Sequence, residues 1–196
     1  MTTHHADHLD SIRRQLEAFR RQKDKWMQES ADSPLEHHQR HTFTGLNYYP
    51  IDFAYRVPAK MVADARPHAI KIQTTKDEWR EYNHYGELQF EIDGQPLALQ
   101  VYQPVGDHAH GGSKELFVPF RDATSGKDTY GAGRYIDLRA LDTDEYTLDF
   151  NRAYSPWCAY SPYYSCTLPP PENQLGVEIR AGEKTFEEHE AHDDHD

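Results

Sequence analysis

The sequence has no long apolar run. No hydrophobic stretch approaches the roughly 20 residues that a membrane-spanning helix needs, and only 37% of the 196 residues are hydrophobic. Residues 1–19 lack an apolar core followed by small residues, so we expect no signal peptide. These absences predict a cytoplasmic protein that does not contact membranes.

Basic residues are also scarce. Lysine and arginine together number 21 against 33 aspartates and glutamates, which gives a net charge of −12. Nucleic acids and anionic membranes are bound through basic surfaces, so we expect neither as a partner. The acidic residues are spread along the chain, and arginine outnumbers lysine by 13 to 8. This composition favours a salt-adapted, halophilic origin, because salt screens the repulsion between surface charges; an ordinary acidic protein is the alternative.

The chain has only two cysteines, Cys158 and Cys166, which lie eight positions apart. Buried, reduced thiols are the favoured interpretation, because a cytoplasmic location disfavours a disulfide. As metal ligands the pair would need two further ligands, and its spacing is wider than that of common zinc sites. A disulfide and a metal or redox role of the pair stay open as alternatives.

Charge is missing altogether between Arg152 and Glu172. This stretch holds both cysteines, four tyrosines, one tryptophan and five prolines. Proline fixes the backbone and removes N–H donors, so the segment can cross a surface without joining a sheet. Its aromatic side chains would then form a stiff wall or lid over a sheet or cavity. The alternative is a loop that covers the core.

Two helices are predicted in residues 1–42, which we treat as a helical extension. Apolar residues repeat at helical spacing over residues 9–27, and we expect this stripe to pack on the same chain. The stripe consists of Leu9, Ile12, Leu16, Phe19 and Trp26. Ser33-Pro34-Leu35-Glu36 has the pattern of a helix start, with Ser33 as the cap, and predicts a short helix to about His41.

Residues 43–186 are predicted to form a β domain, because the apolar residues alternate there. The clearest element is a hairpin, in which Leu88–Ile92 and Leu97–Val101 flank the turn Asp93-Gly94. This density of short strands predicts a mainly β fold, an antiparallel barrel or sandwich with N-terminal helices. The other predicted elements are a strand at Leu116–Phe120, a second hairpin from Tyr135–Leu141 and Tyr146–Phe150, and a last strand at Leu175–Ile179.

The two ends of the chain are polar. Residues 4–8 and the acidic, histidine-rich tail 187–196 are expected to be disordered. The chain has thirteen histidines. Those inside it are scattered, and we predict no site from His37, His38, His41, His68 or His84.

Several long motifs resemble one family. They are GLNYYPID, FRDATSG, TYGAGRY, DFNRAYSPWCAY, SCTLPPPEN and AGEK. Over about residues 40–185 the chain closely resembles the uncharacterised bacterial and archaeal proteins grouped as domain of unknown function 1684. The resemblance implies a complete domain and implies no particular activity.

Polar residues at the ends of the predicted strands form a candidate site. Arg121 and Asp122 follow one apolar strand, and Arg134 opens the next. Asp149 and Asn151 point to one face of a later strand, because side chains alternate with period two. Polar groups at strand ends are well placed to line the mouth of a barrel. The alternative is a structural network in which the arginines pair with the aspartates and pin loops.

The pattern favours binding of a small anionic or carbonyl-bearing molecule in a pocket of the β domain. Arg121 and Arg134 would clamp it, because a guanidinium matches a carboxylate or phosphate in two places. Asp149 and Asn151 would orient it. The side chains that would close over it are Tyr130 and Tyr154.

Whether the protein is an enzyme, and whether it uses a cofactor, stays open. A reaction would most simply use Asp122 or Asp149 as a general base, with a pKa raised by burial. The alternative function is an interaction protein or homodimer that uses the aromatic surface of residues 154–164. In that case the aromatic side chains should form one exposed patch with no polar cavity beneath them.

Overall fold

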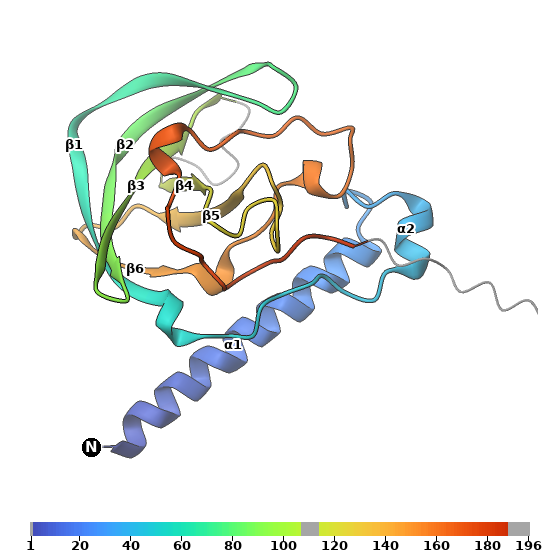
Figure 1. Cartoon of the computed structure of the whole chain (residues 1–196), viewed down its shortest axis with the longest axis horizontal. Coiled ribbons are helices and arrows are strands. Elements are labelled where there is room, and N and C mark those ends of the chain that lie inside the picture. Colours follow the sequence, from blue (N-terminus) through green and yellow to red (C-terminus); the bar gives the residue numbers. More distant parts are fainter. Residues whose placement is uncertain (1, 107–113, 188–196) are drawn as a thin grey trace, which may run out of the picture.

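The computed structural model describes residues 2–106 and 114–187. It consists of a long N-terminal helix and a six-stranded antiparallel sheet that curls into a half-barrel (Figure 1). The mainly β, antiparallel fold with N-terminal helices is therefore confirmed. The tail 187–196 was expected to be disordered. Apart from Glu187, it lies outside the described residues.

The strands follow one another along the sheet in the order β5-β4-β3-β2-β1-β6. The helices are α1 (Thr2–Glu29) and α2 (His37–Thr42), and the strands are β1 (Arg56–Gln73), β2 (Trp79–Ile92), β3 (Gln95–Pro104), β4 (Glu115–Phe120), β5 (Arg134–Arg139) and β6 (Glu145–Asp149). Short 3₁₀ turns occur at Phe53–Tyr55, Phe150–Arg152, Trp157–Ala159 and Pro171–Asn173. Residues 4–8, which we expected to be disordered, belong to α1.

The helix predicted over residues 9–27 is present inside the longer α1, which runs diagonally below the sheet in Figure 1. Leu16 of the predicted stripe is fully buried. Polar contacts tie the helix to the segment before the sheet: Arg20 donates to the carbonyl of Tyr49 at 2.8 Å, and the Leu46 N–H donates to Asp24 at 3.0 Å. The helix therefore packs on its own chain, as expected.

The second helix starts later than predicted. Ser33 does not cap it, because the Ser33 hydroxyl donates to the carbonyl of Met27 and accepts from the Leu35 N–H. These bonds turn the chain at the end of α1. The helix begins at His37 instead, with Glu36 as its N-cap and the Gln39 side chain accepting from the Glu36 N–H at 2.7 Å.

The hairpin predicted around Asp93-Gly94 is confirmed as β2 and β3. Asp93 and Gly94 have φ values of 52° and 78°. Two consecutive left-handed residues make the tight turn whose twist matches that of the flanking strands. Glycine has no Cβ to oppose this conformation, so the sequence determined the turn locally.

The second predicted hairpin is wrong, although both of its strands exist. β5 and β6 lie at opposite edges of the sheet, since β5 pairs with β4 and β6 pairs with β1. The connection between them crosses the open side of the half-barrel, where the Leu141 N–H donates to the Tyr146 hydroxyl at 2.9 Å. A hollow of about 490 Å³, lined by Asp137, Arg139, Thr147 and others, separates the two edges.

The predicted last strand at Leu175–Ile179 is also wrong, because no strand forms there. Its apolar residues are nevertheless buried, with Leu175 5% and Ile179 0% exposed. The backbone donors bond to a turn instead of a strand: the Leu175 N–H donates to the carbonyl of Arg121, and the Ile179 N–H donates to the Asp122 carboxylate. Alternation here reflects burial against that turn.

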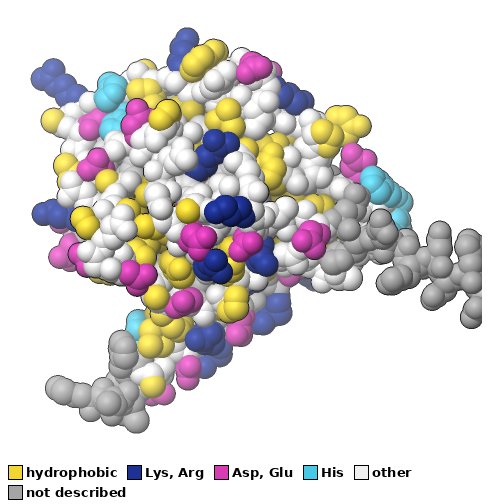
Figure 2. Space-filling model, viewed as in Figure 1, with side chains coloured by type: hydrophobic (Ala, Val, Ile, Leu, Met, Phe, Trp, Pro, Cys, Tyr) yellow, Lys and Arg dark blue, Asp and Glu magenta, His cyan; other side chains and the backbone are white. Residues whose placement is uncertain are grey.

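The main core fills one face of the curled sheet. It includes Leu88, Leu99, Val118, Leu148 and Phe150, each 0% exposed. The surface is strongly charged, and on the face seen in Figure 2 acidic and basic side chains are scattered among one another. No helix in the described part of the chain is both long and apolar enough to span a membrane.

Candidate functional site

The two longest strands change faces along their length. The pairing of β1 with β2 shifts between residues 63 and 68, and the pairing of β2 with β3 shifts between residues 84 and 86. Bulges of this kind move the following side chains to the opposite face. On one side of them Leu88 belongs to the main core, and on the other side Ile70 and Tyr82 belong to a second cluster.

Gly86 permits this switch. A Cβ at Gly86 would meet the Val62 carbonyl oxygen and would lie 2.7 Å from Ala63 Cα. The backbone of β1 thus passes over Gly86 too closely for any side chain. The bulges carry His68 and His84 onto the face opposite the main core.

A pocket of about 580 Å³ lies on this second face. We call it the proline-walled pocket, because residues 168–172, with three consecutive prolines, form one side of it. The sheet side includes Ile70, Ile72, His84, Gln100 and Tyr102, and Trp79, Lys71 and Arg121 stand around it. Its volume falls in the range of pockets that hold small molecules, which is roughly 300–1,000 Å³.

Backbone and side-chain hydrogen bonds fix the wall in place. The Leu168 N–H donates to the carbonyl of Gln73 at 2.8 Å. Asn173, 0% exposed, accepts from the Gln100 N–H at 2.7 Å and donates to the carbonyls of Gln100 and Pro119 at 2.9 and 2.7 Å. Asn173 thereby bridges β3 and β4, where the two strands share a single register pair.

Arg121 enters this pocket directly after β4. Its backbone is held by Asn173 and Leu175, through N–H···O distances of 2.9 and 2.8 Å. Its side chain is half-buried, its Nε is inaccessible to solvent, and no described residue accepts a hydrogen bond from its guanidinium. The nearby Lys71 is already paired with Glu81 at 3.5 Å. Arg121 is therefore the cation in the pocket that lacks a protein partner among the described residues.

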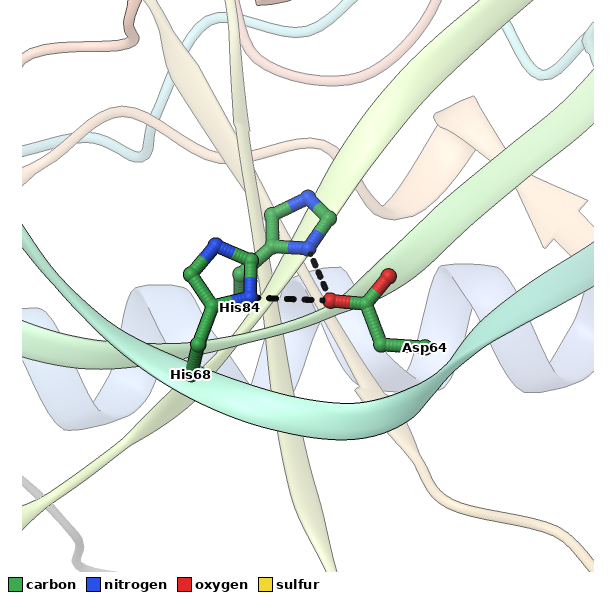
Figure 3. Close-up of side chains that lie close together, drawn as sticks. All are labelled: Asp64, His68 and His84. Atoms are coloured by element: carbon green, nitrogen blue, oxygen red, sulfur yellow. Dashed lines mark hydrogen bonds and ion pairs between the residues drawn. The ribbon is translucent and has the colours of Figure 1, made fainter.

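Two histidines and an aspartate meet at the edge of the same pocket (Figure 3). Asp64 Oδ2 lies 2.7 Å from His84 Nδ1 and 3.3 Å from His68 Nδ1. Among the described residues this trio forms the one group of three whose donor atoms could hold a metal ion. Sequence reasoning assigned no role to these residues. The bulges bring these residues together, and Gly86 inside β2 was the local signal that could have indicated a bulge.

Arg134 and Asp122 are two of the predicted site residues. They pair with each other, and neither lines the proline-walled pocket. Arg134 is 0% exposed and donates to the carbonyls of Ile179, Ala181 and Glu183, and its Nη2 lies 3.4 Å from Asp122 Oδ1. Burial lowers the pKa of Arg134, and the charge of Asp122 opposes that change. The Arg134 Nε also has no hydrogen-bond partner within the described part of the chain. This network ties the C-terminal segment to β5.

Asp149 and Asn151 form a second, separate network. Asp149 pairs with Arg56 at 2.8 Å and accepts from the backbone and side chain of Asn151 at 3.1 and 3.0 Å. Asn151 also accepts from the Asp52 N–H at 3.0 Å and donates to its carbonyl at 2.8 Å. The pair therefore joins the segment before β1 to the end of β6.

Tyr130 lies beside the two cysteines. Its hydroxyl contacts Cys158 Sγ at 3.5 Å, and the Cys158 N–H donates to Cys166 Sγ at 3.3 Å. Both thiols are free. Hydrogen bonding to the Cys166 thiol, aided by Tyr130, lowers the pKa of Cys158 to about 6, whereas the same bond and burial raise the pKa of Cys166. Neither cysteine belongs to the metal-competent group found among the described residues.

Tyr154 lies in another hollow of about 490 Å³, beneath the aromatic segment. Its hydroxyl donates to Asp137 at 2.9 Å. The aromatic residues that line this hollow are Tyr82, Phe117, Tyr135, Trp157, Tyr163 and Tyr164. The predicted site residues thus occupy five separate places in the fold, and Arg121 alone among them lines the proline-walled pocket.

The fold places the chain among small, mainly β proteins in which a half-barrel is joined to an N-terminal helix. The chain belongs to the family described as "Protein of unknown function (DUF1684)", whose model matches residues 41–184. It is also similar to an uncharacterised protein from gene locus rrnAC0354 of Haloarcula marismortui, known from a solution NMR structure. The two are 40% identical over 93% of this chain and 99% of that one, with a TM-score of 0.72.

Haloarcula is a halophile, which is consistent with the origin expected from the composition. No curated protein matches the chain.

Proposed function

We propose that this protein binds a small molecule that carries a carboxylate or phosphate group in the proline-walled pocket, with Arg121 as its anion contact. One observation carries the proposal: Arg121 is half-buried in a pocket and lacks a protein acceptor among the described residues. Only the Nε of this guanidinium is inaccessible to solvent, so its two Nη atoms can donate to an acceptor supplied by a ligand. A guanidinium suits both carboxylates and phosphates.

The rest of the pocket suits the organic part of such a molecule. Ile70, Ile72 and Tyr102 offer apolar surface on the sheet side, and the prolines of residues 168–172 offer it on the wall. Pockets of this type bind through apolar contacts and use a few polar groups for orientation. Gln100 also lines the pocket, and its amide is already hydrogen-bonded to Glu87 and His84.

No reaction is included in the proposal. Asp122 accepts hydrogen bonds from Thr124, Ile179 and Arg134, and Asp149 is paired with Arg56 and Asn151. Carboxylates that are held in this way serve the fold, and neither lines the pocket.

Ligand-observed NMR with a panel of anions tests the proposal. The panel should hold inorganic phosphate, phosphate esters and carboxylic acids, each beside its uncharged amide or alcohol. We expect binding by charged members only, weakened at least tenfold in Arg121→Gln and partly kept in Arg121→Lys, because lysine retains charge and loses the fork. The matched control is Arg180→Gln, which removes an exposed arginine paired with Glu178. Equal binding by Arg121→Gln and the wild type would refute the proposal.

The alternative is association of two copies through residues 154–164. Trp157 and Tyr163 are 45% and 76% exposed, and Trp157 stacks on Trp26 with ring centroids 6.3 Å apart. The hollow beneath the segment, lined in part by Arg80 and Asp137, counts against a simple docking face. Light scattering over a range of protein concentrations tests this alternative. A dimer in the wild type that becomes a monomer in Trp157→Ala would favour association of two copies.

A further inference from the structure

The cluster of Asp64, His68 and His84 has the donor spacing of a metal site. Tetrahedral Zn²⁺ with bonds of about 2.0–2.1 Å places its ligand atoms roughly 3.4 Å apart. Asp64 Oδ2 is 3.3 Å from His68 Nδ1 and 2.7 Å from His84 Nδ1, and one donor atom from each of the three residues lies within 4.8 Å of the other two. Figure 3 shows both imidazole rings directed at the same carboxylate oxygen. A small adjustment of these side chains would admit an ion.

The surroundings of His84 favour a cation between it and Asp64. Gln100 donates its amide N–H to Glu87 at 2.8 Å, so its oxygen faces His84 Nε2, also at 2.8 Å. Hydrogen bonds from Gln89 and Gln100 lower the pKa of Glu87, which makes it an ionised acceptor and fixes the orientation of the amide. His84 Nε2 must therefore carry a proton.

A neutral imidazole has a single N–H, so His84 Nδ1 then presents a lone pair to Asp64 Oδ2. Two acceptors 2.7 Å apart require a proton or a metal ion between them. Metal-binding histidines commonly donate their second ring N–H to such a carbonyl or carboxylate, which fixes the tautomer. Gln100 and Glu87 supply that arrangement.

We propose that Asp64, His68 and His84 bind one divalent transition-metal ion through Asp64 Oδ2 and the two Nδ1 atoms. Two imidazoles with one carboxylate suit Zn²⁺ and its neighbours in the first transition row, whereas Mg²⁺ and Ca²⁺ favour oxygen ligands. Three protein ligands leave a coordination position open, and His84 lines the proline-walled pocket. The inference goes beyond the proposed anion binding and is independent of it.

Calorimetric titration of the full chain with Zn²⁺ tests the site. His68 is the ligand to replace, because its side chain is 63% exposed and its loss leaves no buried gap. We expect one equivalent of Zn²⁺ to bind the wild type, and His68→Ala and Asp64→Asn to weaken that binding at least tenfold. Millimolar Mg²⁺ should not compete.

The matched control is His41→Ala. It breaks the close pair of His37 and His41, whose rings are 4.5 Å apart on α2, and should change the Zn²⁺ affinity less than twofold. The terminal histidines are present in every variant and cancel in the comparison. Co²⁺ gives a second readout, since its visible absorption should appear in the wild type and disappear in His68→Ala. Unchanged Zn²⁺ binding in His68→Ala and Asp64→Asn would overturn the proposal, and so would the absence of a one-equivalent site.

Discussion

Arg134 and Arg121 lie in two regions of the molecule, and their guanidinium groups differ in burial and in hydrogen-bond partners. Arg134 is fully enclosed and bonds to three carbonyls and Asp122. Arg121 is half-buried at a pocket and has no acceptor among the described residues. The first region joins the C-terminal segment to the sheet, whereas the second, the proline-walled pocket, leaves the Arg121 guanidinium without a hydrogen-bond acceptor among the described residues. Residue type alone therefore does not distinguish an arginine that holds the fold together (an anchor) from one that can bind a ligand. The hydrogen-bond partners of the guanidinium distinguish them.

The largest effect should come from removing the anchor. Arg134→Met leaves the buried Asp122 carboxylate without its cation and three carbonyls without their donor, and breaking a buried pair in this way costs about 3–5 kcal/mol. We expect the free energy of unfolding in urea to fall by that amount. A loss no larger than that of Arg121→Met would contradict the comparison.

A smaller loss is expected from Asn173→Ala. It removes the bridge between β3 and β4 and leaves the buried backbone groups of Gln100 and Pro119 unpaired, for about 2 kcal/mol. Urea unfolding again measures the change. Gln174→Ala, at the exposed neighbour, should stay within about 0.5 kcal/mol; if the two variants match, Asn173 does not hold the wall.

The two thiols offer a contrast of their own. Since the pKa of Cys158 is lowered to about 6, its thiolate fraction should rise roughly tenfold between pH 5 and pH 7 and then level off. The pKa of Cys166 is raised, so that thiol should stay unreactive over the same range. Iodoacetamide labelling with peptide mapping checks this, and Tyr130→Phe should move the Cys158 midpoint upward. A Cys158 midpoint above pH 8 would count against the hydrogen bonds described.

The smallest effect belongs to Arg121→Met. The wild-type guanidinium makes no hydrogen bond to the described residues, so its removal should change the free energy of unfolding by no more than about 0.5 kcal/mol. Loss of anion binding without loss of stability would sharpen the contrast with Arg134. A cost above 2 kcal/mol would mean that Arg121 is an anchor as well.

Local signals predicted the parts of the fold that local interactions determine. The Asp93-Gly94 turn and the apolar stripe of α1 each depend on residues that are close in the sequence, and both are present. The pairing of β5 and β6 was mistaken because a short connection favours a hairpin, whereas here it crosses between the two edges of a half-barrel. Which edges approach each other depends on the curl of the whole sheet.

The candidate site was less predictable than the fold. Arg121 was predicted to bind a ligand and lies in the proline-walled pocket, but its binding role stays a prediction. Arg134, Asp122, Asp149 and Asn151 were grouped with it only because strand ends attract polar residues. The histidine cluster was missed, because His68 and His84 reach one face only through bulges in β1 and β2. A bulge depends on how neighbouring strands pack, as the close approach of Val62 to Gly86 illustrates.

The most direct test of the account is a phosphate titration followed through the arginine Nε–H signals in ¹H–¹⁵N NMR spectra. Arg121 and Arg134 are read in the same sample, so each serves as the control for the other. The account predicts that the Arg121 signal shifts in a saturable manner while the Arg134 signal stays in place. An Arg121 signal that does not shift, or equal shifts of both signals, would contradict the claim that Arg121 binds an anion in the proline-walled pocket.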